Sequence, residues 1–488
     1  MRRHPVLALM LMSIDQTTGT RVTIRTARDV HALLAERGSQ GRRTKAIIVL
    51  ALGGIFMDAY DFSSLAFGIT AVKEEFGLDP LMTGFVNAAI MVGSVVGALF
   101  GGMLVDRFGR YKLFMADMAF FVVAAIGCAL APNEWVLIVF RFVMGVGVGL
   151  DLPVAMAFLA EFSKLTGSGS RSQRVNAWSP AWYIATGFGY LLVLAVFLIL
   201  PVAQQGLLWR VVVGFGAVPA IIVLLVRRKY MAESPHWLAD QGDLRGAVDV
   251  MRSHHGLDVE LAADADTIRT TAKRTGHWRQ YGELFAARYR LRTIAALCVS
   301  VFSTFGYNAV AYGTPLIIAM LFQQGPLVTI LSALVINLGF GAAGGLLGVR
   351  FINRVGARRM TIIGFAIQAA SLLILAFVGI PTGALVLISI AMLAAFVFAQ
   401  AGGPGANLMS YATLSYPTRL RGVGVGFNEA VKRVFSIVSL VFFPVLAASL
   451  STGVFWIVAL APLAGLISLL VITWDPTGKD VDAEDLDG

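Results

Sequence analysis

The chain has 488 residues, of which 57% are hydrophobic and only 14% are charged, and its mean hydropathy is +0.76. A water-soluble domain is about a quarter charged because its surface must meet water, so this composition excludes a soluble protein. The net charge of +10 would suit a nucleic-acid partner. However, the cations lie mostly between apolar runs, so we expect no nucleic acid and a lipid bilayer instead.

Twelve apolar runs are long enough to cross a hydrocarbon core, which needs about 20 helical residues. Because a bilayer offers the backbone no water to bond, each run must form a helix, and we predict an all-α membrane protein. In chain order the predicted spans are 45–70, 84–105, 111–131, 135–160, 176–200, 207–226, 293–322, 327–349, 359–379, 383–409, 423–449 and 453–474.

One long polar segment separates the sixth span from the seventh. It predicts an N-terminal six-helix bundle at 45–226 and a C-terminal six-helix bundle at 293–474, joined by a central loop at 227–292. Residues 1–44 and the acidic residues 475–488 are the predicted N-terminal and C-terminal tails. We expect both tails and the central loop to be cytoplasmic.

The basic residues predict this orientation. With the N-terminus inside, all but five of the 39 Lys and Arg residues fall on the cytoplasmic side. The five exceptions are Lys73, Arg141, Arg210, Lys432 and Arg433. Such a bias is the positive-inside pattern of a multi-pass protein, and we expect it in the plasma or inner membrane of the cell.

The second half of the sequence repeats polar landmarks of the first half at a constant offset of 247 residues. Gly109, between the second and third spans, corresponds to Gly356 between the eighth and ninth. The same offset carries Asp61 of the first span onto Asn308 of the seventh. Parallel repeats of this kind place a substrate site at their interface, near the bilayer midplane.

Four sequence motifs lie in or between the predicted spans. They are Gly102-x3-Asp106-Arg107-x-Gly109-Arg110 after the second span, Arg141-x3-Gly145-x-Gly147-x-Gly149-Leu150-Asp151-Leu152-Pro153 up to Glu161 in the fourth, Glu233-Ser234-Pro235-His236-Trp237-Leu238 after the sixth, and Tyr416-Pro417-Thr418-Arg419-Leu420-Arg421-Gly422 after the tenth. Together they resemble the major facilitator superfamily, in its branch of sugar porters and phosphate and metabolite:proton symporters. The resemblance implies twelve transmembrane helices in two six-helix halves, and a transporter rather than an enzyme.

Two positions depart from the phosphate symporters within that branch. Their seventh-span aspartate is Asn308 here, and the asparagine that follows Gly-Pro in their tenth span is Gly405. Because both changes remove polar groups that a phosphate site uses, we expect phosphate not to be the cargo.

Four charged residues inside predicted spans are candidates for proton coupling. Asp58 and Asp61 share one face of the first span at about mid-membrane depth, and Asp151 lies at a similar depth in the fourth. Because burial and neighbouring carboxylates both favour the protonated form, such groups can exchange protons near neutral pH. Arg141 is their candidate counter-charge. Alternatively, one or two of these acids are permanently ionised structural partners of Arg141.

Five residues are candidates for substrate binding. Asn308 lies in the middle of the seventh span, and Tyr312 follows it by one helical turn. Trp182 and Tyr183 belong to an aromatic cluster in the fifth span, although such residues equally serve ordinary helix packing. Lys432 lies in the eleventh span, where the resemblance to phosphate symporters implies an anion-binding lysine. A snorkelling lysine without a substrate role is the alternative.

The motif after the second span resembles the superfamily's conformational gate. The residues that would form it are Gly102, Asp106, Arg107, Gly109 and Arg110, with Glu161 at the end of the fourth span. The resemblance implies that they latch one state of the transport cycle. The glycines follow a membrane helix rather than a strand, so they do not indicate a nucleotide-binding loop.

These features predict a secondary active transporter that moves a small polar metabolite by proton symport and alternating access. A small organic anion is the first choice of cargo because Arg141, Lys432 and Arg433 are embedded in the spans. A sugar or polyol porter is the alternative, and a transporter-like membrane sensor is a remote one. We expect no cofactor, no metal and no obligate protein partner.

Overall fold

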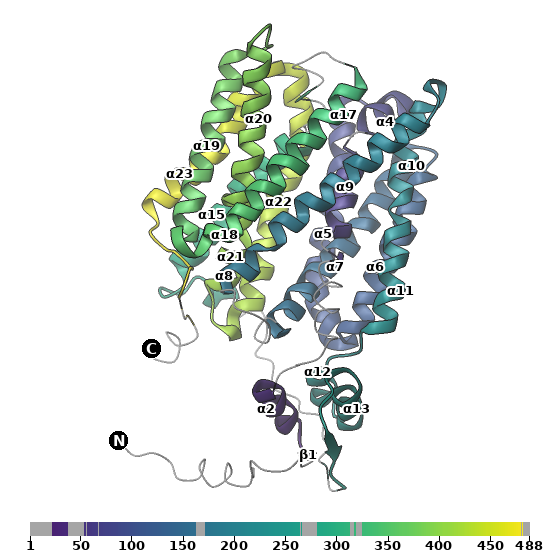
Figure 1. Ribbon diagram of the computed structural model, residues 1–488, viewed down its shortest axis with the longest axis vertical. Coiled ribbons are helices and arrows are strands. Elements are labelled where there is room, and N and C mark those ends of the chain that lie inside the picture. The colour runs from purple at the N-terminus through teal and green to yellow at the C-terminus, as the bar shows by residue number, and fades with distance from the viewer. Residues whose placement is uncertain are drawn as a thin grey trace. The chain divides into compact units, whose positions relative to one another are not determined.

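The structure is a computed structural model that describes residues 22–37, 53–54, 56–66, 68–162, 171–263, 265, 281–312, 317–318, 325–479 and 481. The chain divides into two compact units. The small unit falls within residues 1–44 and 232–272, and the membrane unit falls within residues 45–231 and 273–488. Helices make up most of the described residues (Figure 1).

The N-terminal half of the membrane unit is a bundle of long helices. In the first predicted span, residues 53–54 and 56–64 are helical. The elements that follow are α4 (Ile69–Phe76), α5 (Pro80–Phe108), α6 (Arg110–Ala129), α7 (Glu134–Phe162), α8 (Arg171–Asn176), α9 (Trp178–Ile199), the 3₁₀-helix η1 (Val202–Leu207), α10 (Leu208–Phe215) and α11 (Ala217–Tyr230). Helix α7 packs against both α5 and α6, and α6 also contacts α10 and α11.

The C-terminal half is built in the same manner. Its elements are α15 (Arg290–Tyr307), the π-helix η2 (Asn308–Tyr312), α17 (Pro326–Leu334), the π-helix η3 (Val335–Gly341), α18 (Ala342–Val355), α19 (Ala357–Val378), α20 (Leu385–Gly402), α21 (Pro404–Leu414), α22 (Thr418–Leu450), the 3₁₀-helix η4 (Ser451–Gly453) and α23 (Val454–Val471). Helix α22 packs against α15 of its own half and against α5 of the other half.

The helices agree with the twelve predicted spans. Among the described residues, nine helical stretches are long and apolar enough to cross a membrane. One of them, Leu420–Val471, contains both α22 and α23 and so covers two predicted spans. The other two spans are the first, of which the structure describes a part, and the fourth, α7, which carries Glu134, Arg141 and Asp151.

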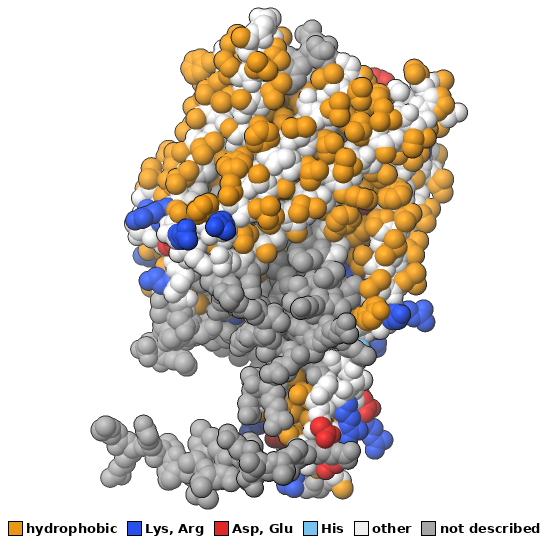
Figure 2. Space-filling view, in the orientation of Figure 1, with side chains coloured by type: hydrophobic (Ala, Val, Ile, Leu, Met, Phe, Trp, Pro, Cys, Tyr) orange, Lys and Arg blue, Asp and Glu red, His pale blue; other side chains and the backbone are white. Residues whose placement is uncertain are grey.

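The exterior of the membrane unit is apolar. Figure 2 shows hydrophobic side chains over most of the face that it presents, with Lys and Arg side chains towards its lower end. Large apolar side chains such as Val123, Leu198, Phe377 and Leu387 are exposed. Because a bilayer interior accepts only apolar surface, this exterior suits contact with lipid.

Glycines let α5 and α7 approach each other closely. Gly93 and Gly97 of α5 face Gly145 and Gly149 of α7. A Cβ atom at Gly93 would lie 2.0 Å from the carbonyl oxygen of Phe142, and a Cβ at each of the other three would lie within 2.3 Å of a facing carbonyl oxygen. Small residues at this spacing are typical of tightly packed membrane helices. The pair therefore forms a rigid centre for the N-terminal half.

The internal repeat is visible in the backbone. Gly109 joins α5 to α6 with φ 92° and ψ 163°, and Gly356 joins α18 to α19 with φ 88° and ψ 150°. Only glycine adopts such angles without strain, so the 247-residue offset relates two junctions of the same geometry. This similarity supports a duplicated architecture for the two halves.

The small unit contains parts of the predicted N-terminal tail and central loop. The strands β1 (Val22–Ile24) and β2 (Val259–Leu261) pair in parallel, and the helices are α2 (Ala27–Arg37), α12 (Pro235–Asp240) and α13 (Leu244–His255). Ile24, Val30, Met251 and Val259 are fully buried in its core. Parts of two segments predicted to be separate thus share one hydrophobic core.

Candidate functional site

A cavity lies between the two halves of the membrane unit. From the N-terminal half it is lined by Asp58, Phe62, Met91, Trp178, Ser179, Trp182 and Tyr183, and from the C-terminal half by Thr304, Tyr307, Asn308, Gln400, Gly405, Leu408, Met409, Lys432, Arg433 and Ser436. It therefore lies where the internal repeat predicted a substrate site. Four of the five candidate substrate residues line it: Asn308, Lys432, Trp182 and Tyr183.

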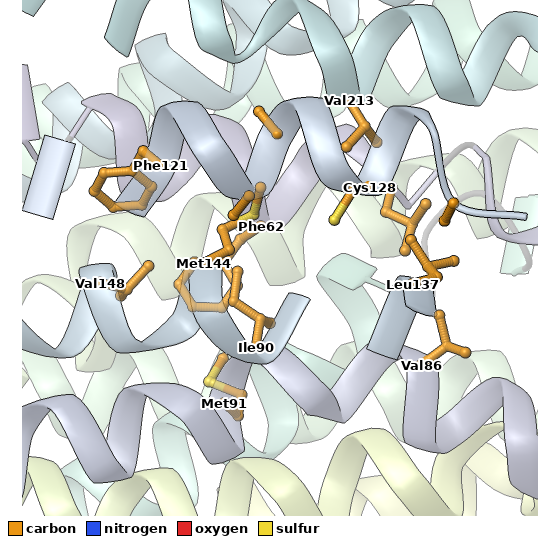
Figure 3. Packing of buried hydrophobic residues seen from close by; sticks show 14 of the residues in the cluster. Phe62, Val86, Ile90, Met91, Phe121, Cys128, Leu137, Met144, Val148 and Val213 are labelled. Carbon is orange, nitrogen blue, oxygen red and sulfur yellow. The ribbon is translucent and has the colours of Figure 1, made fainter. Parts of the chain in front are cut away.

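An apolar core holds the helices that carry Asp58, Asp61 and Asp151. Figure 3 shows Phe62, Ile90, Met144 and Cys128 in this core, which draws on the first span and on α5, α6, α7 and α10. Packing of this kind fixes side chains in place, because protein interiors are as dense as organic crystals. The charged groups described below are thus attached to a rigid frame.

Aromatic side chains form one wall of the cavity and connect the halves. The indole Nε1 of Trp182 donates a hydrogen bond to the hydroxyl of Tyr307 over 2.9 Å. The ring of Trp182 lies 5.9 Å from that of Phe62 and 6.1 Å from that of Trp178, and Tyr183 meets Tyr307 edge to face at 6.3 Å. Such a wall can stack against the apolar face of a small ligand.

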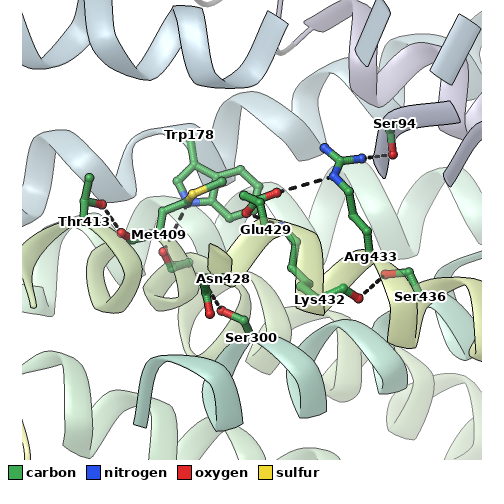
Figure 4. Close-up of polar contacts among 11 residues, drawn as sticks. Ser94, Trp178, Ser300, Met409, Thr413, Asn428, Glu429, Lys432, Arg433 and Ser436 are labelled. Atoms are coloured by element: carbon green, nitrogen blue, oxygen red, sulfur yellow. Dashed lines mark hydrogen bonds and ion pairs between the residues drawn. The ribbon is translucent and has the colours of Figure 1, made fainter. Parts of the chain in front are cut away.

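Two cations enter the cavity from α22. Lys432 forms an ion pair of 2.5 Å with Glu429, and Arg433 Nε lies 3.7 Å from the same carboxylate (Figure 4). Arg433 also donates a hydrogen bond to Ser94 of α5, in the other half. Asn428 donates to Ser300 over 2.7 Å. Glu429 thus connects Lys432 and Arg433, and Arg433 reaches across to the N-terminal half.

Asn308 marks an irregularity in the seventh span. It is buried at the point where α15 gives way to the π-helix η2, and its Nδ2 has no hydrogen-bond partner among the described residues. Single π-helical turns in membrane and soluble helices occur frequently at functional sites. The amide is therefore placed to donate to a ligand in the cavity.

Asp58 and Asp61 are buried without partners. Each is 1% exposed, and neither has a hydrogen-bond partner for its carboxylate oxygens among the described residues. Asp58 lines the cavity, and the charged groups that act on it are Asp151, Arg433, Asp61 and Arg227. Isolated buried carboxylates are unfavourable, so these two positions suit reversible protonation.

Arg141 is a cation that acts on Asp61. Its Nε donates a hydrogen bond to the carbonyl of Val86 over 3.1 Å, and the residue is 3% exposed. A Cβ atom at Gly216 would lie 3.1 Å from Asp61 Oδ1, so the junction of α10 and α11 closes over the carboxylate. The structure thus brings together two residues, Asp61 and Arg141, that the sequence named as candidates for proton coupling.

The partner of Asp151 is a residue that the sequence did not single out. Asp151 is fully buried, and its Oδ1 pairs with Arg227 of α11 over 3.0 Å instead of with Arg141. Arg227 also holds Asp117 of α6, with Nη1 at 3.0 and 3.1 Å from its two oxygens. The central loop was predicted to begin at Arg227, because the polar segment after the sixth span starts there. The signal for Asp117 was a lone carboxylate inside the third span.

The candidate gate falls largely outside the described side chains. The side chains of Asp106, Arg107, Arg110 and Glu161 are not described, and the surroundings of Gly102 are not described either. The side chain of Tyr312 in the seventh span is likewise not described. Their backbones belong to α5, α6, α7 and η2. Gly109, which has the positive φ given above, is buried at the turn between α5 and α6.

Comparisons with known proteins agree with this architecture. The sequence matches the family model "Sugar (and other) transporter" over residues 46–482. It is 26% identical over 456 residues to an arabinose-proton symporter of Bacillus subtilis (strain 168), covering 89% of this chain and 92% of the relative. It is also 26% identical over 446 residues to the niacin transporter NiaP of Acinetobacter baylyi, covering 89% and 94%.

A solved structure shows the same fold. The major facilitator superfamily proton:xylose symporter XylE superposes with a TM-score of 0.70 at 18% identity, covering 91% of this chain and 98% of that chain. The predicted major facilitator fold, with twelve membrane helices in two halves, is confirmed.

Proposed function

Because the chain belongs to the sugar (and other) transporter family, we propose that it moves a small polar metabolite across the membrane by proton symport and alternating access. One observation carries the proposal: Asp58 is buried without a hydrogen-bond partner among the described residues and lines the cavity between the halves. A carboxyl group at that point can bind a proton and respond to cargo in the same space.

A sugar or polyol is the first candidate cargo. The relatives include an arabinose-proton symporter, and the structural match is a proton:xylose symporter. The aromatic wall of Trp178, Trp182 and Tyr307 offers faces for stacking, and Asn308 offers a free amide donor among the described residues. The comparisons thus favour a sugar or polyol, which the sequence analysis took as the alternative to an organic anion.

A small organic anion is the second candidate. Lys432 and Arg433 line the cavity, and together they carry one positive charge more than their partner Glu429. With Asp58 protonated, an anion would balance this excess, so proton and anion would enter together. NiaP, a niacin transporter, is a relative of similar identity to the sugar transporters.

The gate and the membrane orientation that the sequence predicts are part of the same proposal. The motif at Gly102, Asp106, Arg107, Gly109 and Arg110, with Glu161, would act as the gate. The positive-inside pattern supports a plasma or inner membrane with cytoplasmic termini and a cytoplasmic central loop.

Reconstitution into liposomes tests the function. The purified protein would be given an inward pH gradient and a panel of L-arabinose, D-xylose, D-glucose, myo-inositol and nicotinate, with the membrane potential clamped. We expect uphill uptake of one cargo class together with proton influx. Uptake that only equilibrates, at the same rate with and without the gradient, would refute symport. Uptake of nicotinate but not of the sugars would select the second candidate.

A further inference from the structure

Arg227 holds two carboxyl groups side by side in the interior of the N-terminal half. Its Nη1 contacts both oxygens of Asp117, and its Nη2 lies 3.0 Å from Asp151 Oδ1. The guanidinium also donates to the carbonyl of Phe114 over 2.9 Å and lies over the ring of that residue, 4.4 Å from its centre. Because both Nη atoms belong to one planar group, the two carboxyl groups it binds are neighbours.

The charges of this cluster do not cancel. Arg227 and Asp151 are fully buried and Asp117 is 1% exposed, so water does not screen them. One cation faces two acids, which leaves a buried negative charge if both acids are ionised. A buried charge without compensation is strongly unfavourable, whereas one proton shared by the two carboxyl groups makes the cluster neutral. Asp151 Oδ2, which has no hydrogen-bond partner among the described residues, is a free position for that proton.

The cluster adjoins the acid that lines the cavity. A Cβ atom at Gly54 of the first span would lie 1.9 Å from Asp151 Oδ2, so the helix touches this carboxyl group directly. Asp58 follows Gly54 by one helical turn, about 6 Å along the axis and on the same face. Among the described side chains, the charged groups around the cluster and Asp58 come from the first span, α6, α7, α11 and α22: Asp58, Asp61, Asp117, Asp151, Arg227 and Arg433.

We propose that Asp117 and Asp151, held together by Arg227, form a second proton-binding site that receives the proton from Asp58 on its way out of the cavity. The pair first releases the proton that it holds to water. The O–H bond of Asp58 then breaks as an O–H bond to Asp151 Oδ2 forms. Arg227 is a positioning residue, since it orients both carboxyl groups and limits them to one proton. The transfer rests on the proton symport proposed above.

Infrared spectroscopy of the reconstituted full chain tests the shared proton without any cargo. Protonated carboxyl groups have their own carbonyl-stretch band, and its area counts them. At neutral pH we expect Asp117→Asn to remove one carboxyl group from this band, because Asp151 alone is neutralised by Arg227. Asp151→Asn should do the same. Arg227→Gln should enlarge the band by one carboxyl group, whereas Arg227→Lys should leave it unchanged.

Asp79→Asn is the matched control, since Asp79 is an exposed carboxylate that caps α5 through the amide of Met82. It should leave the band unchanged. If Asp117→Asn and Asp151→Asn also leave the band unchanged, the pair holds no proton and the proposal is overturned. This result does not depend on whether the protein is a symporter.

Transport of L-arabinose and nicotinate then tests the role of the site. A pH gradient of one unit supports accumulation of up to about tenfold for one proton per neutral molecule. Asp117→Asn should lower the accumulation ratio to one while exchange of internal for external cargo continues, and Arg227→Lys should retain accumulation. A merely structural ion pair would instead impair accumulation and exchange alike, and that outcome would overturn the assigned role. If the wild type accumulates no cargo, the function proposed above fails, and the infrared result still decides on the proton site.

Discussion

Replacing Asn176 with alanine should favour opening of the two halves at the end where α8 meets α21. Asn176 of the N-terminal half is fully buried; it donates a hydrogen bond to Asn407 over 2.8 Å and accepts one from Ser410 over 2.7 Å. Ser179 and Trp178 add bonds to backbone carbonyls of the C-terminal half. These contacts cross between the halves, so they exist only while this end is closed.

The size of the effect follows from those two side-chain bonds. Each neutral hydrogen bond contributes about 0.5–1.5 kcal/mol net. Asn176→Ala removes both and leaves Asn407 and Ser410 short of a partner in the closed state only, because water reaches them once the end opens. The closed state should therefore lose about 1–3 kcal/mol, which moves the equilibrium towards opening by roughly 5- to 150-fold.

Distances between spin labels measure this equilibrium. Labels at Arg228→Cys on α11 and Arg354→Cys on α18 place one probe on each half, and both positions are exposed. The chain has two native cysteines, Cys128 and Cys298, which are replaced first. Double electron–electron resonance on the variant with Asn176→Ala should show a larger population at long distance than the parent protein.

Asn428→Ala is the control for loss of a buried amide. Its side chain donates to Ser300, which belongs to the same half, so the substitution removes no bond between the halves. The label distances should then match those of the parent. Equal distance distributions for Asn176→Ala and Asn428→Ala would refute the idea that these bonds hold the halves together.

Three further substitutions separate roles within the membrane unit. Gly54→Ala places a Cβ 1.9 Å from Asp151 Oδ2 and should cost about 1–3 kcal/mol of stability, which a lower melting temperature would show. Gly53→Ala is the control, because its Cβ has its nearest neighbour at 3.6 Å, and this variant should melt like the parent. Asp61→Asn should abolish accumulation driven by a pH gradient but retain exchange; full accumulation would remove Asp61 from the coupling mechanism. Lys432→Gln should raise the KM of an anionic cargo about 10- to 150-fold, from the loss of a charged hydrogen bond, and leave the KM of a neutral sugar unchanged.

The helical spans, the internal repeat and the buried face of the first span could be predicted from patterns in the sequence. The twelve spans follow from run lengths, and the 247-residue offset identified Gly109 and Gly356, whose backbone angles agree. The helical period placed Asp58 and Asp61 on one buried face. The spans and their faces are local features, because hydrogen bonding in a bilayer forces each apolar run to become a helix by itself.

The partners of the buried charges depend on packing between distant helices, and these the sequence did not provide. Arg227 meets Asp151 across 76 residues and Asp117 across 110. Its neighbours in the chain, Arg228 and Lys229, are exposed, so a run of three cations appeared to be one cytoplasmic flank. Only the packing of α11 against α6 turns the first of the three inward, where it also reaches Asp151 of α7. No pattern in the chain predicted that parts of the N-terminal tail and the central loop share a core.

Asp58 connects the proton to the movement of the halves in the proposed cycle. It is attached to the N-terminal half, and Arg433, which acts on it, belongs to α22 of the C-terminal half. When Asp58 is ionised, opposite charges attract across the cavity, and separating the halves breaks that attraction in a medium of low dielectric constant. When Asp58 is protonated the attraction disappears, and Arg433 keeps Ser94 as its neutral partner in the other half. The protonated carrier therefore opens at a lower cost than the ionised one. Transfer of the proton from Asp58 to Asp117 and Asp151 restores the attraction. One buried carboxyl group between the halves is therefore enough to make the conformational equilibrium depend on proton binding.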